Sequence, residues 1–422
     1  MLITPHIYGA RSRYLSQTRG TAATPPPPDP PGTAGTTIDY YGSPPTQIIP
    51  SDGSNPVRSG QGVWTQVDSF YDIYYAVQNS QPNDTILIEP GNYETYGGSK
   101  YQLDTVDHRL YILHNLTIEG NGGMANFIGF ADPVDTQPEL GSYGSIYVQD
   151  GFVQPYNTFH DISLTCRNLG FYNYRRYLDS AHVGRGIGFH PEAGNLLCED
   201  CVFEDCGQAV HGKKFDGFYN YYGETKESFT AGNITLNRCT FNNVGYSNNT
   251  AVVRILGMSN VILDACTLNG SADTKFFDCY GCDHLWIRNG SVLDECHVGY
   301  SSFDCRYLGA LTIEDSTVIF QDRDGPSTGG RGIDLGSKQT DETEIVVVLD
   351  NNVLINDNKT NFSLMEGGAA GAGLCDITWT NNVHRSYGSA TWRNLSFAAT
   401  QSGNTFDSTP PANGDTFTMP SP

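Results

Sequence analysis

The chain has 422 residues, of which 38% are hydrophobic and 12% aromatic, with 47 glycines and a formal net charge of −22. This composition can form a long apolar core, and its acidity argues against nucleic acid and against an anionic membrane as partners. No apolar run approaches the length of a membrane span, so we expect no membrane insertion.

Residues 1–60 differ in composition from the rest of the chain. Prolines cluster at 25–28, 30–31 and 44–45, with Gly, Thr and Ser between them, which is typical of an extended arm without a core. The first residues also lack the apolar core of a secretory signal. We expect the arm to anchor the protein in a larger assembly, with a disordered tail as the alternative. Export would then occur by assembly or lysis, unless a signal is missing from this sequence.

Residues 68–80 are predicted to form a short amphipathic helix, because Phe70, Ile73, Tyr74 and Val77 fall on one helical face. A turn, a strand and a second turn follow in residues 81–93. An exposed first strand of a stacked coil would pair with other edges. We therefore predict that the helix covers the open end of a coil that begins here.

A repeated phrase organises the next three hundred residues. It reads Ile-Thr-Leu-Asn-Arg-Cys-Thr-Phe from Ile234 and returns in looser form at residues 261, 285, 311, 347 and 377, with earlier copies at Leu116, Ile162 and Leu196. Each copy is a short strand, a polar turn and a second strand. Recurrence at roughly 24 to 40 residues indicates a stacked solenoid. Alternation with period 2 and β-branched residues predicts a parallel β-helix.

Equivalent residues of such a coil form columns, because each strand pairs with its counterpart about 4.8 Å away. The turn column is rich in Asn and Asp, which tolerate the left-handed backbone of a sharp corner: Arg238, Ala265, Asn289, Asp315, Asn351 and Asn381. The column beside it holds small residues expected inside the corner: Cys201, Cys239, Cys266, Gly290, Ser316, Asn352 and Asn382. We expect most of the eleven cysteines to be reduced core residues, and no metal at Cys279 and Cys282.

The segment Asp84-Thr-Ile … Pro90-Gly-Asn-Tyr93 resembles the entry of pectin lyase-like proteins, and the repeats extend the resemblance from residue 64 to about residue 400. The resemblance implies an all-β chain with a right-handed single-stranded parallel β-helix and a capping helix over residues 61–385. The arm, 1–60, would precede it, and a C-terminal capping tail would occupy 386–422. That fold hosts lyases, hydrolases, epimerases, esterases, adhesins and bacteriophage tailspikes, so it leaves the activity open.

Polar residues follow a predicted inward residue at six equivalent places: His190, His211, Arg254, Asp278, Asp304 and Asp334. In register, they would form one outward column with three stacked carboxylates. Two like charges about 5 Å apart repel by roughly 1 kcal/mol in water, so a merely structural column would more cheaply hold Thr, Ser or Asn. We predict Arg254, Asp278, Asp304 and Asp334 as catalytic residues, and the two histidines as substrate-binding residues.

Aromatic and cationic residues flank this column in the sequence and suit a polysaccharide, whose sugars stack on rings and hydrogen-bond through hydroxyls. The predicted substrate-binding residues are Tyr174, Arg175, Tyr219, Tyr222, Tyr280, Arg306 and Arg331. The alternative is that the tyrosines pack loops together and the aspartates pair with arginines.

Two reactions suit stacked aspartates. Carboxylates one rung apart lie near the separation of retaining glycosidases, about 5 to 5.5 Å, and those two rungs apart, at about 9.6 Å, near the upper end of the inverting range. Alternatively, the aspartates hold Ca²⁺ against an acidic polymer, as in the pectate lyases that this site resembles, while Arg254 or a lysine takes the proton. No full lyase or polygalacturonase motif is present. Without lyase chemistry we expect no cofactor, and binding without cleavage remains open.

A second outward column bears on assembly. It is predicted to hold Leu197, Thr235, Ile262, Trp286, Thr312, Val348 and Thr378. Its apolar members would leave an exposed strip, which a homotrimer would bury as in tailspikes of this fold; cover by a loop or the tail is the alternative.

Together these patterns favour an extracellular, virion-associated protein similar to a tailspike or tail fibre. Its arm would bind virion structural proteins, and its column would bind, and in one version cleave, a host surface polysaccharide. The alternatives are a stand-alone polysaccharide lyase or glycoside hydrolase, and a non-enzymatic capsid or tail decoration protein.

Overall fold

The computed structural model describes residues 56–94, 110–129, 146–149, 161–174, 185–190, 193–213, 231–245, 251–269, 275–297, 301–321, 331–335, 345–356, 362–366, 375–386, 389–393, 399–405 and 416–418. The chain divides into two units, Met1–Thr36 and Thr37–Pro422, and every described residue belongs to the second. The arm is predicted over residues 1–60, and its residues 1–55 lie outside the described part of the chain. Within the described part of the chain, no helix is long and apolar enough to cross a membrane.

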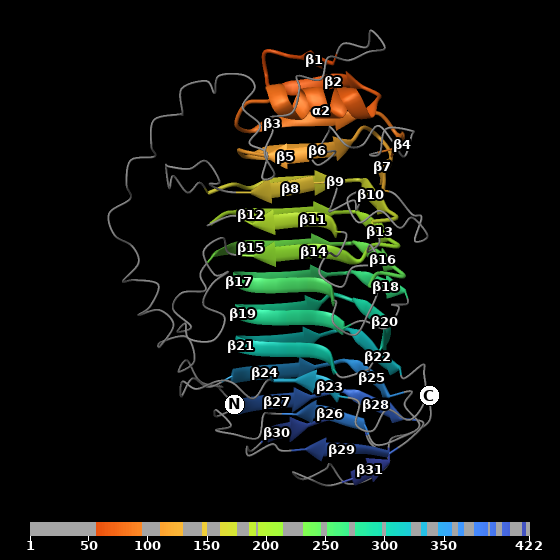
Figure 1. Ribbon diagram of the computed structural model, residues 1–422. Coiled ribbons are helices and arrows are strands. Elements are labelled where there is room, and N and C mark those ends of the chain that lie inside the picture. The colour runs from red at the N-terminus through yellow and green to blue at the C-terminus, as the bar shows by residue number, and fades with distance from the viewer. Residues whose placement is uncertain are drawn as a thin grey trace, which may run out of the picture. The chain divides into compact units, whose positions relative to one another are not determined.

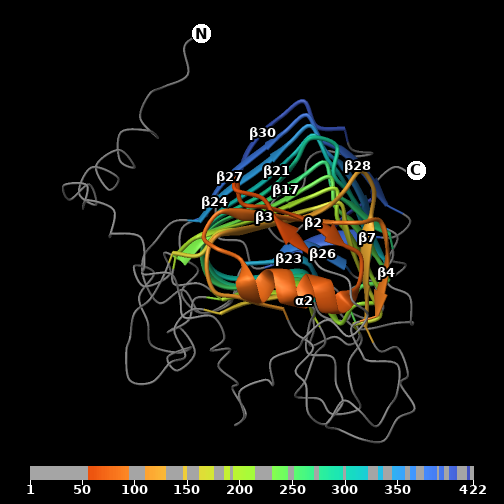
Figure 2. The same ribbon diagram turned by 90° about the horizontal axis from the view of Figure 1, so that it is seen from above.

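The strands of the second unit lie on three faces that follow one another along the chain (Figure 1, Figure 2). The first face holds β2 (Val63–Val67), β3 (Asp84–Ile88), β6 (Leu116–Gly120), β9 (Leu164–Arg167), β12 (Asn195–Glu199), β15 (Ala231–Asn237), β24 (Ile345–Asp350), β27 (Cys375–Thr380) and β30 (Ala399–Ser402). The second face is a 10-stranded sheet of β4 (Gly91–Glu94), β7 (Ala125–Ile128), β10 (Leu169–Tyr172), β13 (Val202–Glu204), β16 (Thr240–Asn242), β18 (Thr267–Asn269), β20 (Val292–His297), β22 (Thr317–Gln321), β25 (Val353–Asn356) and β28 (Val383–Ser386).

The third face holds β5 (Leu110–Ile112), β8 (Ile146–Gln149), β11 (Arg185–His190), β14 (Gln208–Lys213), β23 (Arg331–Asp334), β26 (Phe362–Glu366) and β29 (Ser389–Arg393). Three long strands, β17 (Ala251–Asp264), β19 (Lys275–Arg288) and β21 (Ser301–Glu314), run from the third face onto the first and join both into one 21-stranded sheet. The described strand pairs are parallel except at the ends, where β1 (Val57–Arg58) pairs antiparallel with β2, and β31 (Thr416–Thr418) with β29. The predicted parallel β-solenoid is confirmed; its handedness and its family stay predictions.

The core lies between the three faces. It consists of every second residue of each strand, whose side chain points into the coil. On the second face, four phenylalanines stack at centroid distances of 5.6, 4.9 and 5.4 Å: Phe127, Phe171, Phe203 and Phe241. The register then places Leu268, Leu293 and Val318 in the same column. Because equivalent side chains stack directly, each coil buries its apolar residues against its neighbours.

The corner between the first and second faces follows the sequence prediction closely. All six predicted turn residues have positive φ angles: Arg238, Ala265, Asn289, Asp315, Asn351 and Asn381, with φ between 50° and 58°. Beside them, the predicted small residues are buried, with one correction. Ser291, rather than Gly290, occupies the inner position, because the N–H of Thr317 bonds to Ser291 O and Gly290 is an extra, exposed residue of that turn.

The inner corner column is held together by hydrogen bonds between successive coils. Cysteine thiols occupy its earlier part, where Cys239 Sγ donates to Cys198 O. Asparagines occupy its later part, where the Asn382 side chain donates to Leu349 O and accepts from the N–H of Asn352. Nine cysteine side chains are described, including those of Cys279 and Cys282, and all nine are buried free thiols, as expected of reduced core cysteines.

The predicted helix is α2 (Phe70–Asn79), which begins after Ser69, whose hydroxyl accepts from the N–H of Asp72. Ile73, Tyr74 and Val77 are buried, and the helix contacts β2, β3 and β5. It lies beside β1 and β2, at the end of the stack where the described chain begins (Figure 1). The helix itself is confirmed, and its role as a cap stays a prediction.

Candidate functional site

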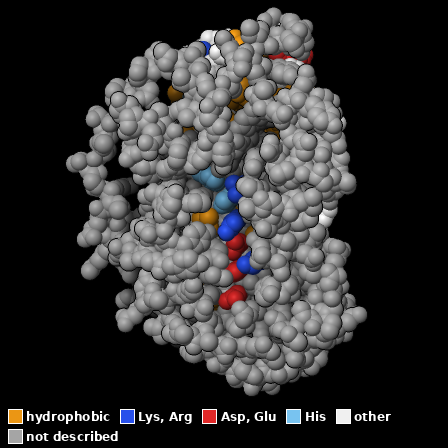
Figure 3. All heavy atoms as spheres, in the orientation of Figure 1, with side chains coloured by type: hydrophobic (Ala, Val, Ile, Leu, Met, Phe, Trp, Pro, Cys, Tyr) orange, Lys and Arg blue, Asp and Glu red, His pale blue; other side chains and the backbone are white. Residues whose placement is uncertain are grey.

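The predicted polar column lies on the third face, and five of its six members are in register. Backbone pairing aligns His211 with Arg254, Arg254 with Asp278, Asp278 with Asp304, and Asp304 with Asp334. The strands β14, β17, β19, β21 and β23 supply one residue each. Figure 3 shows histidine, cationic and acidic side chains gathered in one row on this face. We call these five residues, with Lys275 added below, the polar column.

His190 is the exception, and its predicted register is wrong. Gly188 pairs with His211, whereas His190 pairs with Gln149 and lies two residues further along its strand. A two-residue shift keeps the inward and outward faces unchanged, so the alternating pattern cannot reveal it. The same shift applies to the repeat placed at Ile162, where Leu164 takes the equivalent position. The His190 ring nevertheless contacts that of His211 edge to face, with centroids 5.0 Å apart.

The column continues beyond the residues that we expected. Asp334 pairs with Glu366, and Glu366 with Arg393, so β26 and β29 add two more ionisable residues in backbone register. Glu366 follows Met365, as Asp334 follows Ile333. The same rule of a polar residue after an inward one would have found Glu366.

From Arg254 to Asp304 the charges of the column alternate in sign. Arg254 Nε lies 3.2 Å from Asp278 Oδ2. Lys275 Nζ lies 3.6 Å from Asp278 Oδ1 and 2.5 Å from Asp304 Oδ2. The side chains of Asp278 and Asp304 are each only 5% exposed, and that of Lys275 is 15% exposed. The repulsion expected between the first two carboxylates is therefore offset by an ammonium group that bridges them.

Lys275 was missed because strict alternation places it on the inward face. It stands three residues before Asp278, and a regular strand would direct the two side chains to opposite sides. Here Phe276 and Phe277 are both buried, which breaks the alternation and brings Lys275 to the side of the aspartates. Arg331 stands likewise three residues before Asp334, although only its backbone is described.

The other predicted binding residues have mixed outcomes. Tyr174 is fully buried and presents no ring for sugar stacking, because its side chain belongs to the core. Backbone pairing aligns Tyr280 with Arg306, two residues beyond Asp278 and Asp304, and Arg331 with Ser301. The side chains of these three residues, and all of Arg175, Tyr219 and Tyr222, lie outside the described part of the structure.

Calcium does not fit between the two aspartates as they stand. Ca²⁺ needs six to eight oxygen ligands at about 2.3 to 2.6 Å. The nitrogen of Lys275 already occupies that distance from Asp304 and neighbours Asp278 as well. Across the described residues, no group of three or more His, Cys, Asp or Glu side chains is arranged to hold a metal ion.

The second outward column lies on the first face, with every predicted partner in register from Leu197 to Thr378. Trp286 is part-exposed, and its ring centroid lies 3.8 Å from that of His284 and 6.0 Å from the guanidinium carbon of Arg288. The strip is therefore more polar at its centre than the sequence indicated.

No family model matches the chain, and no curated protein matches its sequence. The class of the protein rests on its geometry alone: a parallel β-solenoid with a row of ionisable side chains along its third face.

Proposed function

We propose that the protein binds a linear polysaccharide of a host surface along the polar column. The register of the column carries this proposal. Five rungs present one ionisable residue each, over about 19 Å, which is four spacings of about 4.8 Å. A polymer lying along the axis would pass one ionisable residue at every rung, of which Arg254 and Asp334 are part-exposed and His211, Asp278 and Asp304 are buried. Carboxylates and guanidinium groups form strong hydrogen bonds with hydroxyls.

The wider proposal is a virion-associated, right-handed β-helix of the pectin lyase-like type, most similar to a bacteriophage tailspike or tail fibre. In it, α2 caps the coil, the arm at residues 1–60 binds virion structural proteins, and three copies associate through the column of Trp286. Support comes from the parallel solenoid, the position of α2 and the part-exposed apolar residues of the first face. The mass of the protein in solution tests the trimer.

Cleavage is the second candidate activity, and the clustering of Arg254, Asp278 and Asp304 favours it. Adjacent rungs bring carboxylates near the separation of retaining glycosidases. A hydrolase would release reducing ends only, whereas a lyase would also form an unsaturated uronate that absorbs in the ultraviolet.

Binding is tested with immobilised bacterial surface polysaccharides and the variants Asp278→Asn, Asp304→Asn and Asp334→Asn. Each substitution removes a charged hydrogen-bond acceptor that contributes roughly 1.5 kcal/mol or more, so we expect about a tenfold loss of affinity or greater. Asp264→Asn is the matched control, because Asp264 is an outward, ion-paired aspartate of the first face.

Unchanged affinity in all three column variants would rule out the column as the binding site. Failure of the wild type to bind any polysaccharide of its host would favour a decoration protein. Turnover by the wild type that the variants lose would establish an enzyme.

A further inference from the structure

Lys275 occupies the space between two carboxylates that belong to neighbouring strands. Asp278 lies on β19, as does Lys275, and Asp304 lies on β21 at the aligned position. The ammonium contacts Oδ1 of Asp278 at 3.6 Å and Oδ2 of Asp304 at 2.5 Å. The other oxygen of Asp278 faces Arg254 at 3.2 Å. The two carboxylates are therefore contacted by two cations, Arg254 and Lys275.

The burial of this group makes the cations necessary. The side chains of Asp278 and Asp304 are each 5% exposed, and that of Lys275 is 15% exposed. Stacked carboxylates with so little solvent repel strongly unless a positive charge lies between them. In proteins that place stacked acids on one surface, a divalent cation with oxygen ligands can supply that charge. Here the chain itself supplies it.

We infer that Lys275 is a built-in cation in the place of a divalent metal ion, so that the polar column is metal-independent. Its ammonium keeps Asp278 and Asp304 together at one spacing of the solenoid. Removal of the ammonium leaves two buried, convergent carboxylates, which become a site for a hard divalent cation such as Ca²⁺. The claim about polysaccharide binding in this inference rests on the proposed function, whereas the claim about cation binding does not.

The experiment titrates Ca²⁺ into the full-length wild type and into Lys275→Met, Lys275→Arg, Asp304→Asn and the double variant Lys275→Met/Asp304→Asn, by calorimetry after treatment with a chelator. We expect no Ca²⁺ binding that depends on Asp304 in the wild type or in Lys275→Arg. Lys275→Met should bind one equivalent at least tenfold more tightly than the wild type, with a Ca²⁺-dependent rise in Tm. The double variant should lose both effects.

Two outcomes would overturn the inference. One is Ca²⁺ binding by the wild type that Asp304→Asn abolishes. The other is a folded Lys275→Met whose Ca²⁺ isotherm equals that of the wild type, because a merely structural lysine would lower the Tm without creating a cation site. If Lys275→Met fails to fold, Lys275→Gln takes its place, and the wild-type titration stands in either case.

A second arm measures polysaccharide binding by the wild type with excess chelator and with Ca²⁺. We expect equal affinities, and a tenfold loss in chelator would overturn metal independence. The Ca²⁺ titrations contain no polysaccharide, so their failure and the failure of the proposed function are separate observations.

Discussion

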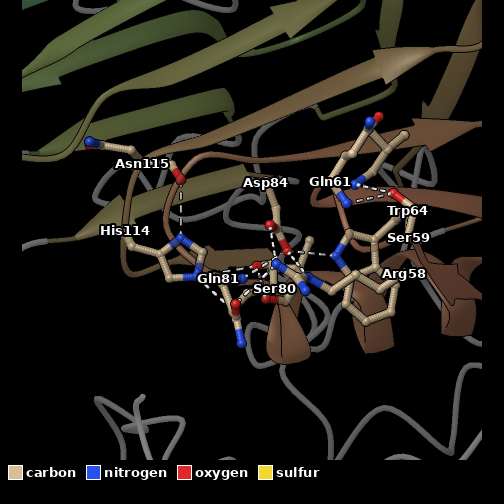
Figure 4. A network of polar contacts seen from close by, with 11 residues as sticks. Arg58, Ser59, Gln61, Trp64, Ser80, Gln81, Asp84, His114 and Asn115 are labelled. Atoms are coloured by element: carbon tan, nitrogen blue, oxygen red, sulfur yellow. Dashed lines mark hydrogen bonds and ion pairs between the residues drawn. The ribbon is translucent and has the colours of Figure 1, made fainter. Parts of the chain in front are cut away.

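The clearest stability prediction concerns Asp84, at the end of the solenoid where α2 lies (Figure 4). Its carboxylate accepts hydrogen bonds from Arg58 Nε at 2.7 Å and Arg58 Nη2 at 2.8 Å. It also accepts from the indole N–H of Trp64 at 2.9 Å and from the backbone N–H of Gln81 at 3.0 Å. Asp84 is 2% exposed and Trp64 is 5% exposed. This carboxylate thus ties β1, β2 and β3 together.

Asp84→Ala removes the acceptor of all four hydrogen bonds and leaves the indole N–H buried. A hydrogen bond to a charged group contributes roughly 1.5 to 3 kcal/mol, but water can replace the carboxylate at Arg58, whose side chain is 30% exposed. We therefore expect a loss of about 3 kcal/mol in the free energy of local unfolding. Because solenoid coils contact only their neighbours, the loss should be confined to this end.

Hydrogen exchange of the amides of β2 and β3 measures this loss. About 3 kcal/mol corresponds to an exchange rate roughly two orders of magnitude faster, while amides of β19 and β21 should keep their protection. Asp200→Asn is the control, because asparagine tolerates the φ of 54° at this position. Arg238 contacts Asp200 through two hydrogen bonds, at 2.8 and 2.7 Å, but the side chains of Asp200 and Arg238 are 46% and 50% exposed. We expect no measurable change there, since exposed pairs contribute little. Equal effects in both variants would refute the argument from burial.

The same network predicts an acid dependence. Burial tends to raise the pKa of Asp84, but the hydrogen bonds from Arg58, Gln81 and Trp64 outweigh burial and lower the pKa below its ordinary value of 3.8. For a carboxyl group with a lowered folded-state pKa, the stabilisation is present above the unfolded value and is lost as the pH falls through the folded value. The protection of the β2 and β3 amides, expressed relative to the intrinsic exchange rate at each pH, should therefore decrease below about pH 4 in the wild type, and this decrease should be absent in Asp84→Ala.

Two further predictions concern the corner and the core. Asn289→Val places a β-branched residue at a φ of 58° and should lower the free energy of unfolding by about 1 to 2 kcal/mol in urea titrations, whereas Asn289→Gly should not; equal losses would contradict a backbone cause. Burial lowers the pKa of His384 to about 3 from 6.5, so the unfolded chain takes up a proton first as the pH falls. Stability should then fall by about 1.4 kcal/mol per pH unit below pH 6.5, and by about 2 kcal/mol at pH 5. His384→Gln, which keeps an acceptor for the indole N–H of Trp379, should remove this part of the pH dependence, and an unchanged dependence would contradict it.

Much of the fold could be predicted from sequence because each coil has the same requirements at its corner and at its inward positions. A corner needs left-handed residues, and the positions of Asn289 and Asn351 satisfy that need in the sequence itself. An inward column needs apolar or small residues, which the repeats supply in phase. Pairing of equivalent strands then brings Asp278 and Asp304 into register, because Phe277 and Phe303, the inward residues directly before them, are paired.

Other features could not be predicted. The alternation of inward and outward residues is unchanged when a strand shifts by two residues, so it does not fix the register, and it does not show where the alternation itself is broken. His190 and Leu164 are displaced by such shifts. Gly290 is an extra residue that local spacing cannot distinguish from a column member. The backbone hydrogen bonds between neighbouring coils decide the register of each of these residues.

The sequence by itself therefore determined that the chain winds into a parallel solenoid and that acids follow inward residues on successive rungs. Only the tertiary structure decided which side chains contact those acids. The paired burial of Phe276 and Phe277 turns Lys275 to the outer side, where its ammonium lies between Asp278 and Asp304. The physical reason is that the direction of a side chain depends on how the strand bends around the core, which no local pattern records.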